Sequence, residues 1–317
     1  MSCSEAIDAS IGREFDPRLI PSVSKIVGGR VRELVPAASL TTYAIGGAIR
    51  AVVTVESRAE AAEILRLLAA EGQPTRVFGF GSNLLVSDSG LNEWIIRLGA
   101  SFKGIESLGA GEFELGGNAS IMAVSRKLSE EGFAGLEFAA GIPASVGGAV
   151  FMNAGAHGGE ICQRIVSVRG VLSDGGDYEW RGADLPWSYR RSGLPQGVLI
   201  TSARIGLVRG DRDTIAKGCA DNLAHRRRTQ PLALPSAGSV FKNPSPDNPA
   251  GRVLEAAGMK GAKLGGAEVS TLHANWIVNP SKSASAADVR GLIELCAKRA
   301  LEVCGVELEP EVRIWGR

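Results

Sequence analysis

Three segments of the chain combine glycine with hydroxyl, amide or charged residues. The first comes directly after an apolar run and contains Gly79, Gly81, Ser82, Asn83 and Leu84. Successive backbone N–H groups in such a turn can face a diphosphate, because glycine has no Cβ to keep the ligand away from the backbone. The segment lacks the third glycine and downstream acid of a Rossmann dinucleotide motif, and it lacks the Gly-Lys-Ser/Thr of a phosphate loop. Either it binds a diphosphate or it is an ordinary turn after a strand.

The second segment, residues 135–161, places many glycines within an apolar stretch. Its small and polar residues include Gly141, Ser145, Gly147, Asn153 and Gly155. This composition does not suit an exposed loop, so we expect a buried backbone whose polar groups need partners. A flavin with its diphosphate would supply them. The alternative is a buried structural crossover.

The third segment, residues 235–261, presents Ser239 after a glycine, where its hydroxyl is free to face a ligand. Lys242 and Asn243 follow and can address an anionic group. The alternative is a turn serine next to a solvated charge. No second His or Cys stands at metal-ligand spacing from His157 or His273, so we expect no metal site. The stretch from His225 to Arg228 either touches a diphosphate or ends a helix whose dipole stabilises it.

Composition limits the classes of partner. The chain has 35 Lys and Arg against 34 Asp and Glu, a net charge of +1, so no overall field attracts nucleic acid or an anionic membrane. Its five cysteines are scattered and odd in number, which is typical of a reducing compartment. The sequence shows neither an apolar run long enough to span a membrane nor the apolar core of a signal peptide. These features lead us to expect a cytoplasmic protein.

The hydrophobic pattern predicts the elements that must position these segments. Residues 1–25 are expected to form a flexible polar leader. Ser57, with Glu60 three residues later, predicts a capped helix over residues 57–70, and a second clear amphipathic helix is predicted over residues 285–304. Further helices are expected at residues 119–131 and 212–225, and strands at residues 51–56, 76–79, 93–98, 164–174, 197–208 and 306–315. After residue 161 the predicted strands and helices no longer alternate regularly, which favours an α+β arrangement over a Rossmann sheet.

Taken together and in order, seven stretches resemble one family, the UDP-N-acetylenolpyruvoylglucosamine reductases. They are TTYAIGG, GFGSNLLVSDSG, residues 135–161, SYRRSG, PSAGSVFKNP, KGAKLGGAEVSTLHANWIVN and GVELEPEVRIWG. The resemblance implies a two-subdomain FAD-binding fold of the vanillyl-alcohol-oxidase type, followed by a C-terminal α/β substrate-binding domain. We expect the FAD-binding region at residues 26–215 and the substrate-binding domain at residues 216–317. The compact spacing between SYRRSG and PSAGSVFKNP resembles the shorter type of the family.

The resemblance also implies an activity: reduction of UDP-N-acetylglucosamine enolpyruvate to UDP-N-acetylmuramate in peptidoglycan precursor synthesis, with NADPH as co-substrate and non-covalent FAD. It assigns Arg190, Ser239 and Glu311 as catalytic residues. Arg190 would hold the substrate carboxylate, a protonated Glu311 would donate to the enolic oxygens, and Ser239 would deliver a proton to C2. Arg191 is the alternative to Arg190. Tyr189, Lys242, Asn243 and His273 would contact the substrate, and a monomer is expected.

Two other functions remain open from the sequence. Flavin oxidases of this fold often carry a histidine in the first glycine-rich loop that bonds covalently to the flavin, whereas Ser82 follows Gly81 here. A non-catalytic flavin- or nucleotide-sugar-binding protein would keep the glycine-rich segments but would not need Arg190, Ser239 and Glu311 together. The presence of all three residues favours the reductase.

Overall fold

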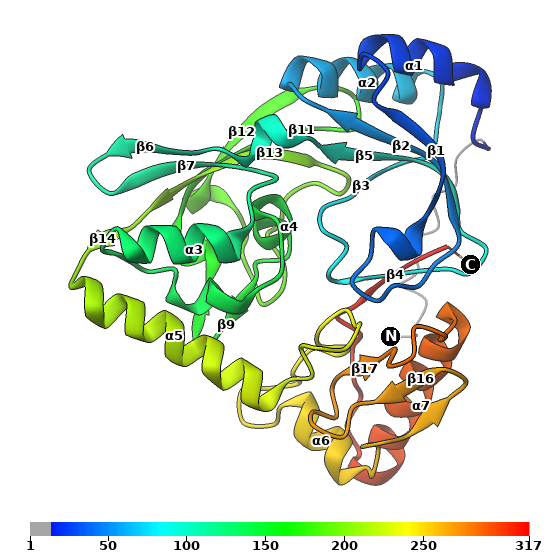
Figure 1. Cartoon of the computed structure of the whole chain (residues 1–317), viewed down its shortest axis with the longest axis vertical. Coiled ribbons are helices and arrows are strands. Elements are labelled where there is room, and N and C mark those ends of the chain that lie inside the picture. Colours follow the sequence, from blue (N-terminus) through cyan, green and yellow to red (C-terminus); the bar gives the residue numbers. More distant parts are fainter. Residues whose placement is uncertain (1–13, 317) are drawn as a thin grey trace.

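The computed structural model describes residues 14–316, which form three lobes (Figure 1). Residues 14–103 build most of the first lobe, the middle of the chain builds the second, and the C-terminal third builds the last. Residues 1–13 of the predicted leader lie outside the described residues. Among the described residues, no helix is both long enough and apolar enough to cross a membrane.

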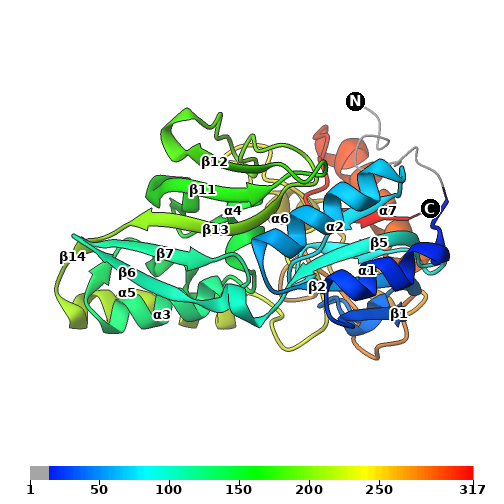
Figure 2. The same ribbon diagram turned by 90° about the horizontal axis from the view of Figure 1, so that it is seen from above.

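The first lobe is a four-stranded mixed sheet with helices on one face. Strand β1 (Val31–Pro36) runs antiparallel to β2 (Ala48–Val55), while β2 and β3 (Thr75–Val77) run parallel to β5 (Leu91–Leu98). Helices α1 (Ile20–Ile26) and α2 (Arg58–Ala70) cover one face (Figure 2). Helix α2 begins as the sequence predicts, since the Ser57 side chain accepts a hydrogen bond from the Glu60 amide.

The leader prediction is wrong for the residues that the structure describes before Ile26. Pro17–Leu19 forms a 3-10 helix that continues into α1. Val23 and Val27 are fully buried against the sheet, and the Phe15 ring lies 4.9 Å from the Trp94 ring. Apolar residues spaced three or four apart give this short stretch a buried face, but about two helical turns among polar neighbours are too brief a pattern to predict.

The second lobe is a five-stranded antiparallel sheet with helices on one side. Its order is β12 (Asp177–Arg181), β11 (Ile165–Val171), β13 (Leu199–Gly206), β7 (Glu112–Gly116) and β6 (Ile105–Gly109). Helix α4 (Val146–Phe151) packs on β13, and α3 (Ile121–Glu130) and α5 (Arg212–Thr229) lie below the sheet in Figure 2. The sequence predicts α3, β11 and β13 but not α4, because two of its six residues are glycines.

Helix α5 places residue 215, the expected domain boundary, inside a continuous element. The helix packs against α3 and against the 3-10 helix Glu137–Gly141, so it belongs to the second lobe to its end. Only Ile215 and Arg226 are buried along its 18 residues. An exposed helix without an apolar stripe gives little indication of where it ends.

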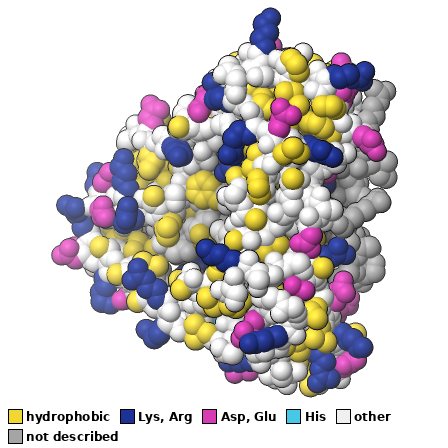
Figure 3. Space-filling view, turned by 45° about the vertical axis from the view of Figure 1, so that its right-hand side comes forward, with side chains coloured by type: hydrophobic (Ala, Val, Ile, Leu, Met, Phe, Trp, Pro, Cys, Tyr) yellow, Lys and Arg dark blue, Asp and Glu magenta, His cyan; other side chains and the backbone are white. Residues whose placement is uncertain are grey.

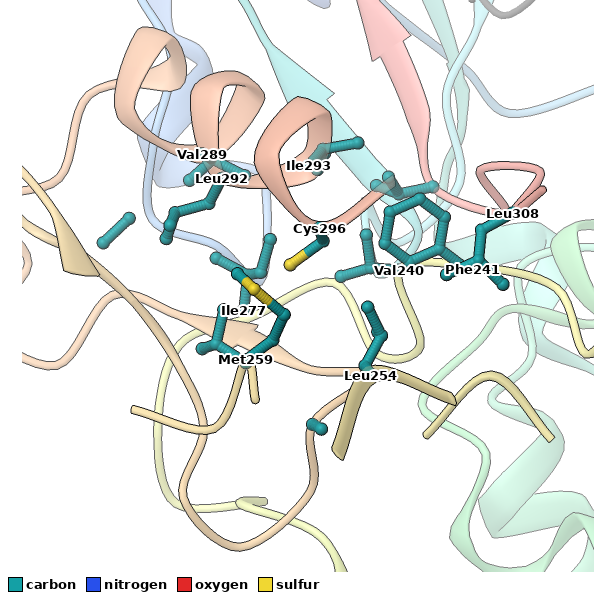
Figure 4. Packing of buried hydrophobic residues seen from close by; sticks show 14 of the residues in the cluster. Val240, Phe241, Leu254, Met259, Ile277, Val289, Leu292, Ile293, Cys296 and Leu308 are labelled. Carbon is teal, nitrogen blue, oxygen red and sulfur yellow. The ribbon is translucent and has the colours of Figure 1, made fainter. Parts of the chain in front are cut away.

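The C-terminal lobe has its own hydrophobic core. Antiparallel strands β15 (Lys263–Leu264), β16 (Ala267–Val269) and β17 (Ile277–Val278) pack with α6 (Ala250–Ala256) and α7 (Ala286–Cys304). Helix α7 begins at a Ser285–Asp288 capping box and ends at Gly305, whose φ is +66°, as the sequence predicts. Figure 4 shows Val240 and Phe241 packed beside Leu308 and α7.

The end of the chain returns to the first lobe. Strand β18 (Arg313–Trp315) pairs in parallel with β4 (Leu84–Val86), directly after the first glycine-rich loop. The predicted strand over residues 306–315 is therefore shorter than expected, because Pro310 interrupts it and pairs only through an isolated bridge to Phe241. Short strands complete the fold: β8 (Phe133–Ala134) with β14 (Val208–Arg209), and β9 (Gly155–Ala156) with β10 (Gly159–Glu160).

Candidate active site

A cavity of about 1450 Å³ lies where the three lobes meet. Figure 3 shows this face hollowed, with hydrophobic side chains in the hollow and Lys and Arg side chains around it. Pockets for one small molecule usually occupy about 300–1,000 Å³. The cavity therefore has room for a large cofactor and a second ligand.

Backbone rather than side chains forms one wall of the cavity, and the two glycine-rich segments meet there. Gly81 has a φ of +66°, and a Cβ at this position would lie 2.4 Å from the Leu40 carbonyl oxygen. A Cβ on Gly79 would lie 2.9 Å from the Ser145 hydroxyl oxygen, which itself accepts a hydrogen bond from the Gly148 amide at the start of α4. Larger residues are therefore excluded, and a ligand can approach the backbone closely.

A third glycine stretch on this wall was missed in the sequence. Gly117 and Asn118 line the cavity after β7, and a Cβ on Gly117 would lie 2.1 Å from the Ile200 carbonyl oxygen. The Gly147 amide donates to the Gly117 carbonyl at 2.9 Å, which joins this stretch to the second glycine-rich segment. The signal was present, since two glycines and an asparagine directly follow a strand-like run.

Arg190 and Glu311 form an ion pair at the edge of the cavity. The Arg190 Nε donates to Glu311 Oε1 at 2.8 Å, and the side chains are 18% and 14% exposed. Arg190 Nη2 donates to the Gly155 carbonyl at 3.1 Å, and the guanidinium lies 4.7 Å from the centre of the Tyr189 ring. Burial raises the pKa of Glu311, although Arg190 and Lys242 act in the opposite direction.

Backbone hydrogen bonds bring Glu311 and Ser239 to the same place. The Glu311 amide donates to the Val240 carbonyl at 2.7 Å, and the Asn83 side chain donates to the Glu311 carbonyl at 3.1 Å. Ser239 lies between Gly238, whose φ is +77°, and the buried Val240. Its side chain lines the cavity and makes no hydrogen bond to any residue that the structure describes. Residues from all three lobes thus converge on one point.

Comparison with known proteins identifies the family. The model of the C-terminal domain of UDP-N-acetylenolpyruvoylglucosamine reductase matches residues 230–315, and an FAD binding domain model matches residues 49–178. The reductase from Myxococcus xanthus is 41% identical over 302 residues, which cover 94% of this chain and 96% of that protein. The one from Bacillus subtilis is 39% identical over 292 residues, covering 91% and 95%. The chain belongs to this reductase family.

A solved structure of the family supports the fold as well. The crystal structure of the reductase from Thermus caldophilus matches with a TM-score of 0.79 and 36% sequence identity, covering 90% of this chain and 99% of that one. The domain order expected from the resemblance is confirmed: an FAD-binding domain is followed by the C-terminal domain of the reductases, in a fold of mixed helices and strands. The family domain begins at residue 230, where α5 ends.

Most of the residues expected in the reductase site line the cavity. These are Gly79, Gly81, Ser82, Asn83, Leu84, Gly141, Ser145, Gly147, Gly155, Arg190, Ser239, Asn243, His273 and Glu311. Arg191, the alternative to Arg190, is not among the lining residues; its side chain is 69% exposed and lies 3.7 Å from Glu309. The structure therefore brings Arg190, and not Arg191, to the expected place.

Three expected site residues do not line the cavity. Asn153 is fully buried, and its side chain bonds only to neighbouring protein groups. Tyr189 is 41% exposed, and its ring supports the Arg190 guanidinium from outside. The Lys242 ammonium pairs with Glu309. Each of the three is adjacent in the sequence to a residue that lines the cavity, but does not line the cavity itself.

The basic end of α5 contributes to the opposite rim. His225 and Arg226 line the cavity, and the rings of His157 and His225 lie 5.5 Å apart. Burial, together with the nearby His225 and Arg226, lowers the pKa of His157. Arg226 is buried and donates to the Gly141 carbonyl, so it serves partly to anchor the second glycine-rich segment. Burial also lowers the pKa of His273, on the C-terminal side.

Proposed function

We propose that this chain uses NADPH and FAD to reduce UDP-N-acetylglucosamine enolpyruvate to UDP-N-acetylmuramate, a step of peptidoglycan precursor synthesis. The observation that carries the proposal is the meeting of Arg190, Glu311 and Ser239 beside a wall of glycine backbone. These residues come from distant parts of the chain, and a protein that only binds a nucleotide would not need to assemble them.

The glycine wall fits FAD. The N–H groups of residues 79–83 make no hydrogen bond within the described part of the chain, so they are open to a diphosphate. The Gly117 and Gly147 amides are used by backbone carbonyls, but a Cβ at either position would collide with the protein or crowd it, so these glycines let a ligand approach the backbone. Gly141 and Gly155 would continue this contact along the second segment. When bound there, FAD supplies hydride transfer from NADPH to the substrate.

Arg190 is proposed to bind the carboxylate of the enolpyruvyl group. A guanidinium is planar, always charged and able to donate two parallel hydrogen bonds, which suits a carboxylate. Its Nε and Nη2 groups are already directed by Glu311 and by the Gly155 carbonyl, so the side chain is held before a ligand arrives. Such preorganised charge stabilises the negative charge that develops when hydride adds to C3.

Glu311 is proposed to act in its protonated form. Burial raises its pKa, and a neutral carboxyl can donate a hydrogen bond to the enolic oxygens instead of repelling them. The pairing with Arg190 limits this shift, so substrate binding, which engages the guanidinium, would favour protonation further. Glu311 and Arg190 thus act on the same oxygens of the substrate.

Ser239 is proposed to protonate C2. A serine hydroxyl is a weak acid, but a carbanionic centre is a strong base and takes a proton from a donor held within hydrogen-bond reach. The hydroxyl has no protein partner among the described residues, so it is available to the ligand. Asn243 and His273 lie on the same C-terminal side and are proposed to contact the substrate, while Lys242 and Tyr189 would act through Glu309 and Arg190.

The setting of the reaction is also part of the proposal. We place the protein in the cytoplasm as a monomer. The four cysteines that the structure describes, Cys162, Cys219, Cys296 and Cys304, are all free thiols, which agrees with a reducing compartment. Size-exclusion chromatography with light scattering would test the oligomeric state.

Anaerobic spectroscopy of the purified protein tests the activity. We expect about one FAD per chain, bleaching of the flavin by NADPH, and recovery of its absorbance when the enolpyruvyl substrate is added, with UDP-N-acetylmuramate as the product. Acid denaturation should release unmodified FAD, because Ser82 stands where oxidases of this fold carry a covalent histidine. Rapid reoxidation by oxygen, with no response to the enolpyruvyl substrate, would favour an oxidase instead.

A further inference from the structure

The turn that carries Arg190 is conformationally strained. Residues 188 and 191 exchange two backbone hydrogen bonds, of 3.0 and 2.9 Å, which close a tight turn. Arg190 is its third residue and has a φ of +61°. Glycine or asparagine normally occupies such a position, because a larger side chain is disfavoured in the left-handed region. A strained residue of this kind persists only when its surroundings hold it.

Asn153 supplies a contact that holds this turn. Its side-chain amide donates to the Ser188 carbonyl at 3.0 Å, the same oxygen that closes the turn, and to Glu160 Oε2 at 3.0 Å. Its Oδ1 accepts from the Cys162 amide at 3.2 Å. Every polar atom of the side chain is therefore used. Asn153 is 0% exposed and has a φ of +42°, a left-handed conformation that asparagine adopts more readily than most residues.

Asn153 thus connects the two segments that contact Arg190 from either side. It lies two residues before Gly155, whose carbonyl accepts from Arg190 Nη2, and it bonds to the carbonyl two residues before Arg190 itself. If the Ser188 carbonyl lost this hydrogen bond and changed its orientation, the turn would rotate and the Arg190 side chain would point elsewhere. The glycine wall that faces the flavin is formed by other residues, since Asn153 does not line the cavity.

We propose that Asn153 is a positioning residue for Arg190: its amide fixes the strained turn so that the guanidinium lies against Glu311 and faces the substrate carboxylate. The inference rests on the proposed function, in which Arg190 binds that carboxylate. It predicts an effect on the oxidation of reduced flavin by the substrate and none on flavin binding.

The substitution Asn153→Asp tests the proposal with little change in shape. A carboxylate can still accept from the Cys162 amide, but it cannot donate to the Ser188 carbonyl, and it repels Glu160. We expect one FAD per chain and flavin reduction by NADPH within about twofold of the wild type. Oxidation by the enolpyruvyl substrate should slow by about 10- to 100-fold, as is typical when a reacting group is misplaced by about 1 Å.

A double-mutant cycle separates positioning from general damage. In an Arg190→Ala background, Asn153→Asp should cause no further slowing of the substrate half-reaction, because the side chain that it positions is gone. Additional slowing there, or equal slowing of both half-reactions in the single variant, would overturn the proposal. Asn279→Asp is the matched control: Asn279 is also 0% exposed and donates to the Tyr43 carbonyl, far from the turn in the sequence. It should lower stability without a selective effect on the substrate half-reaction.

A second variant and a crystal structure test the positioning role of Asn153 if the first variant fails to fold. If Asn153→Asp does not fold, Asn153→Gly removes the amide at a backbone conformation that glycine adopts readily, and the same selective slowing is expected. A crystal structure of either variant reports on Arg190 directly. Loss of the left-handed conformation and of the Glu311 contact would support the inference even if the enolpyruvyl compound were not the substrate. An unchanged Arg190 would contradict it, whatever the activity.

Discussion

The two sides of the cavity are built on opposite principles. The proposed flavin wall, residues 79–84, 117–118 and 141–148, is defined by the absence of side chains, since a Cβ at several of its glycines would collide with protein atoms. The proposed catalytic wall, made of Arg190, Ser239 and Glu311, depends on side chains whose charge or hydroxyl must point to one place. A binding surface for a large cofactor can thus be read from local composition, whereas a catalytic group depends on contacts across the fold.

Substitutions on the flavin wall should have the largest effect. Gly81→Ala places a Cβ 2.4 Å from the Leu40 carbonyl oxygen, so the loop must move. We expect nearly complete loss of FAD from the purified protein, measured by absorbance after denaturation. Gly305→Ala is the matched control, because Gly305 also has a φ of +66° but has open space around it. It should cost about 1 kcal/mol of stability and keep its flavin. Stoichiometric FAD in the Gly81 variant would contradict the assignment of this wall.

On the catalytic wall, Arg190→Lys should be far from conservative. Lysine keeps the charge but loses the forked geometry that now reaches both Glu311 and the Gly155 carbonyl. Turnover should fall by well over tenfold, about 1.4 kcal/mol or more of transition-state stabilisation, while FAD content stays unchanged. The control is Arg191→Lys, on an exposed neighbour, which should be nearly silent. The reverse ranking of the two variants in steady-state assays would move the role to Arg191.

Glu311→Gln should alter the pH dependence more than the maximal rate. Burial raises the pKa of Glu311, so the carboxyl keeps its proton at pH values where an exposed glutamate has lost it. The substrate half-reaction should slow as pH rises through this raised pKa, and any stability that protonation gives the folded state is lost over the same range. The amide still donates, so the variant should lose at most about tenfold, against about 10²–10³ for removing a donor outright. The rate of the substrate half-reaction in the variant should no longer fall as the pH rises. If the rate still falls, a group other than Glu311 is responsible for the pH dependence.

The smallest effect is expected outside both walls, at Tyr43. This side chain is fully buried in the C-terminal core although it comes from the first lobe, and its hydroxyl has no hydrogen-bond partner within the described part of the chain. An unsatisfied buried hydroxyl costs about 1–3 kcal/mol. Tyr43→Phe should therefore raise the free energy of unfolding by about 1 kcal/mol in urea titrations, with normal turnover. A loss of stability would show that the hydroxyl has a partner.

The sequence predicts those elements whose signals are local. Helices α2 and α7 have a serine cap and an apolar face, and both begin and end close to where these signals stand. Helix α4 and the start of α1 are missed, because glycines or a brief pattern hide them. The end of α5 is missed because the helix has hardly any buried face.

In the site, too, features with a local sequence signal can be predicted and those that depend on distant contacts cannot. The glycine-rich segments are visible as composition, although Gly117 and Asn118 were not predicted. Arg190 and Glu311 lie 121 residues apart and look like ordinary surface charges until the fold brings them together. Only the resemblance to the reductase family named them in advance. Asn153 looked like a cofactor ligand from its position among glycines, whereas its hydrogen bonds connect it to the turn of Arg190.

The flavin wall is needed for both half-reactions, whereas the catalytic wall should act only when the substrate oxidises the reduced flavin, and Ser239→Ala tests this difference most directly. The measurement is stopped-flow flavin absorbance under anaerobic conditions, recorded separately for reduction by NADPH and for oxidation by the enolpyruvyl substrate. The alanine variant should keep flavin reduction and substrate binding, while oxidation by the substrate slows by about 10²-fold or more, as is typical of losing a positioned general acid. Ser239→Cys should retain more activity than alanine, because the thiol can still donate a proton. Equal slowing of both half-reactions, or of neither, would contradict the account.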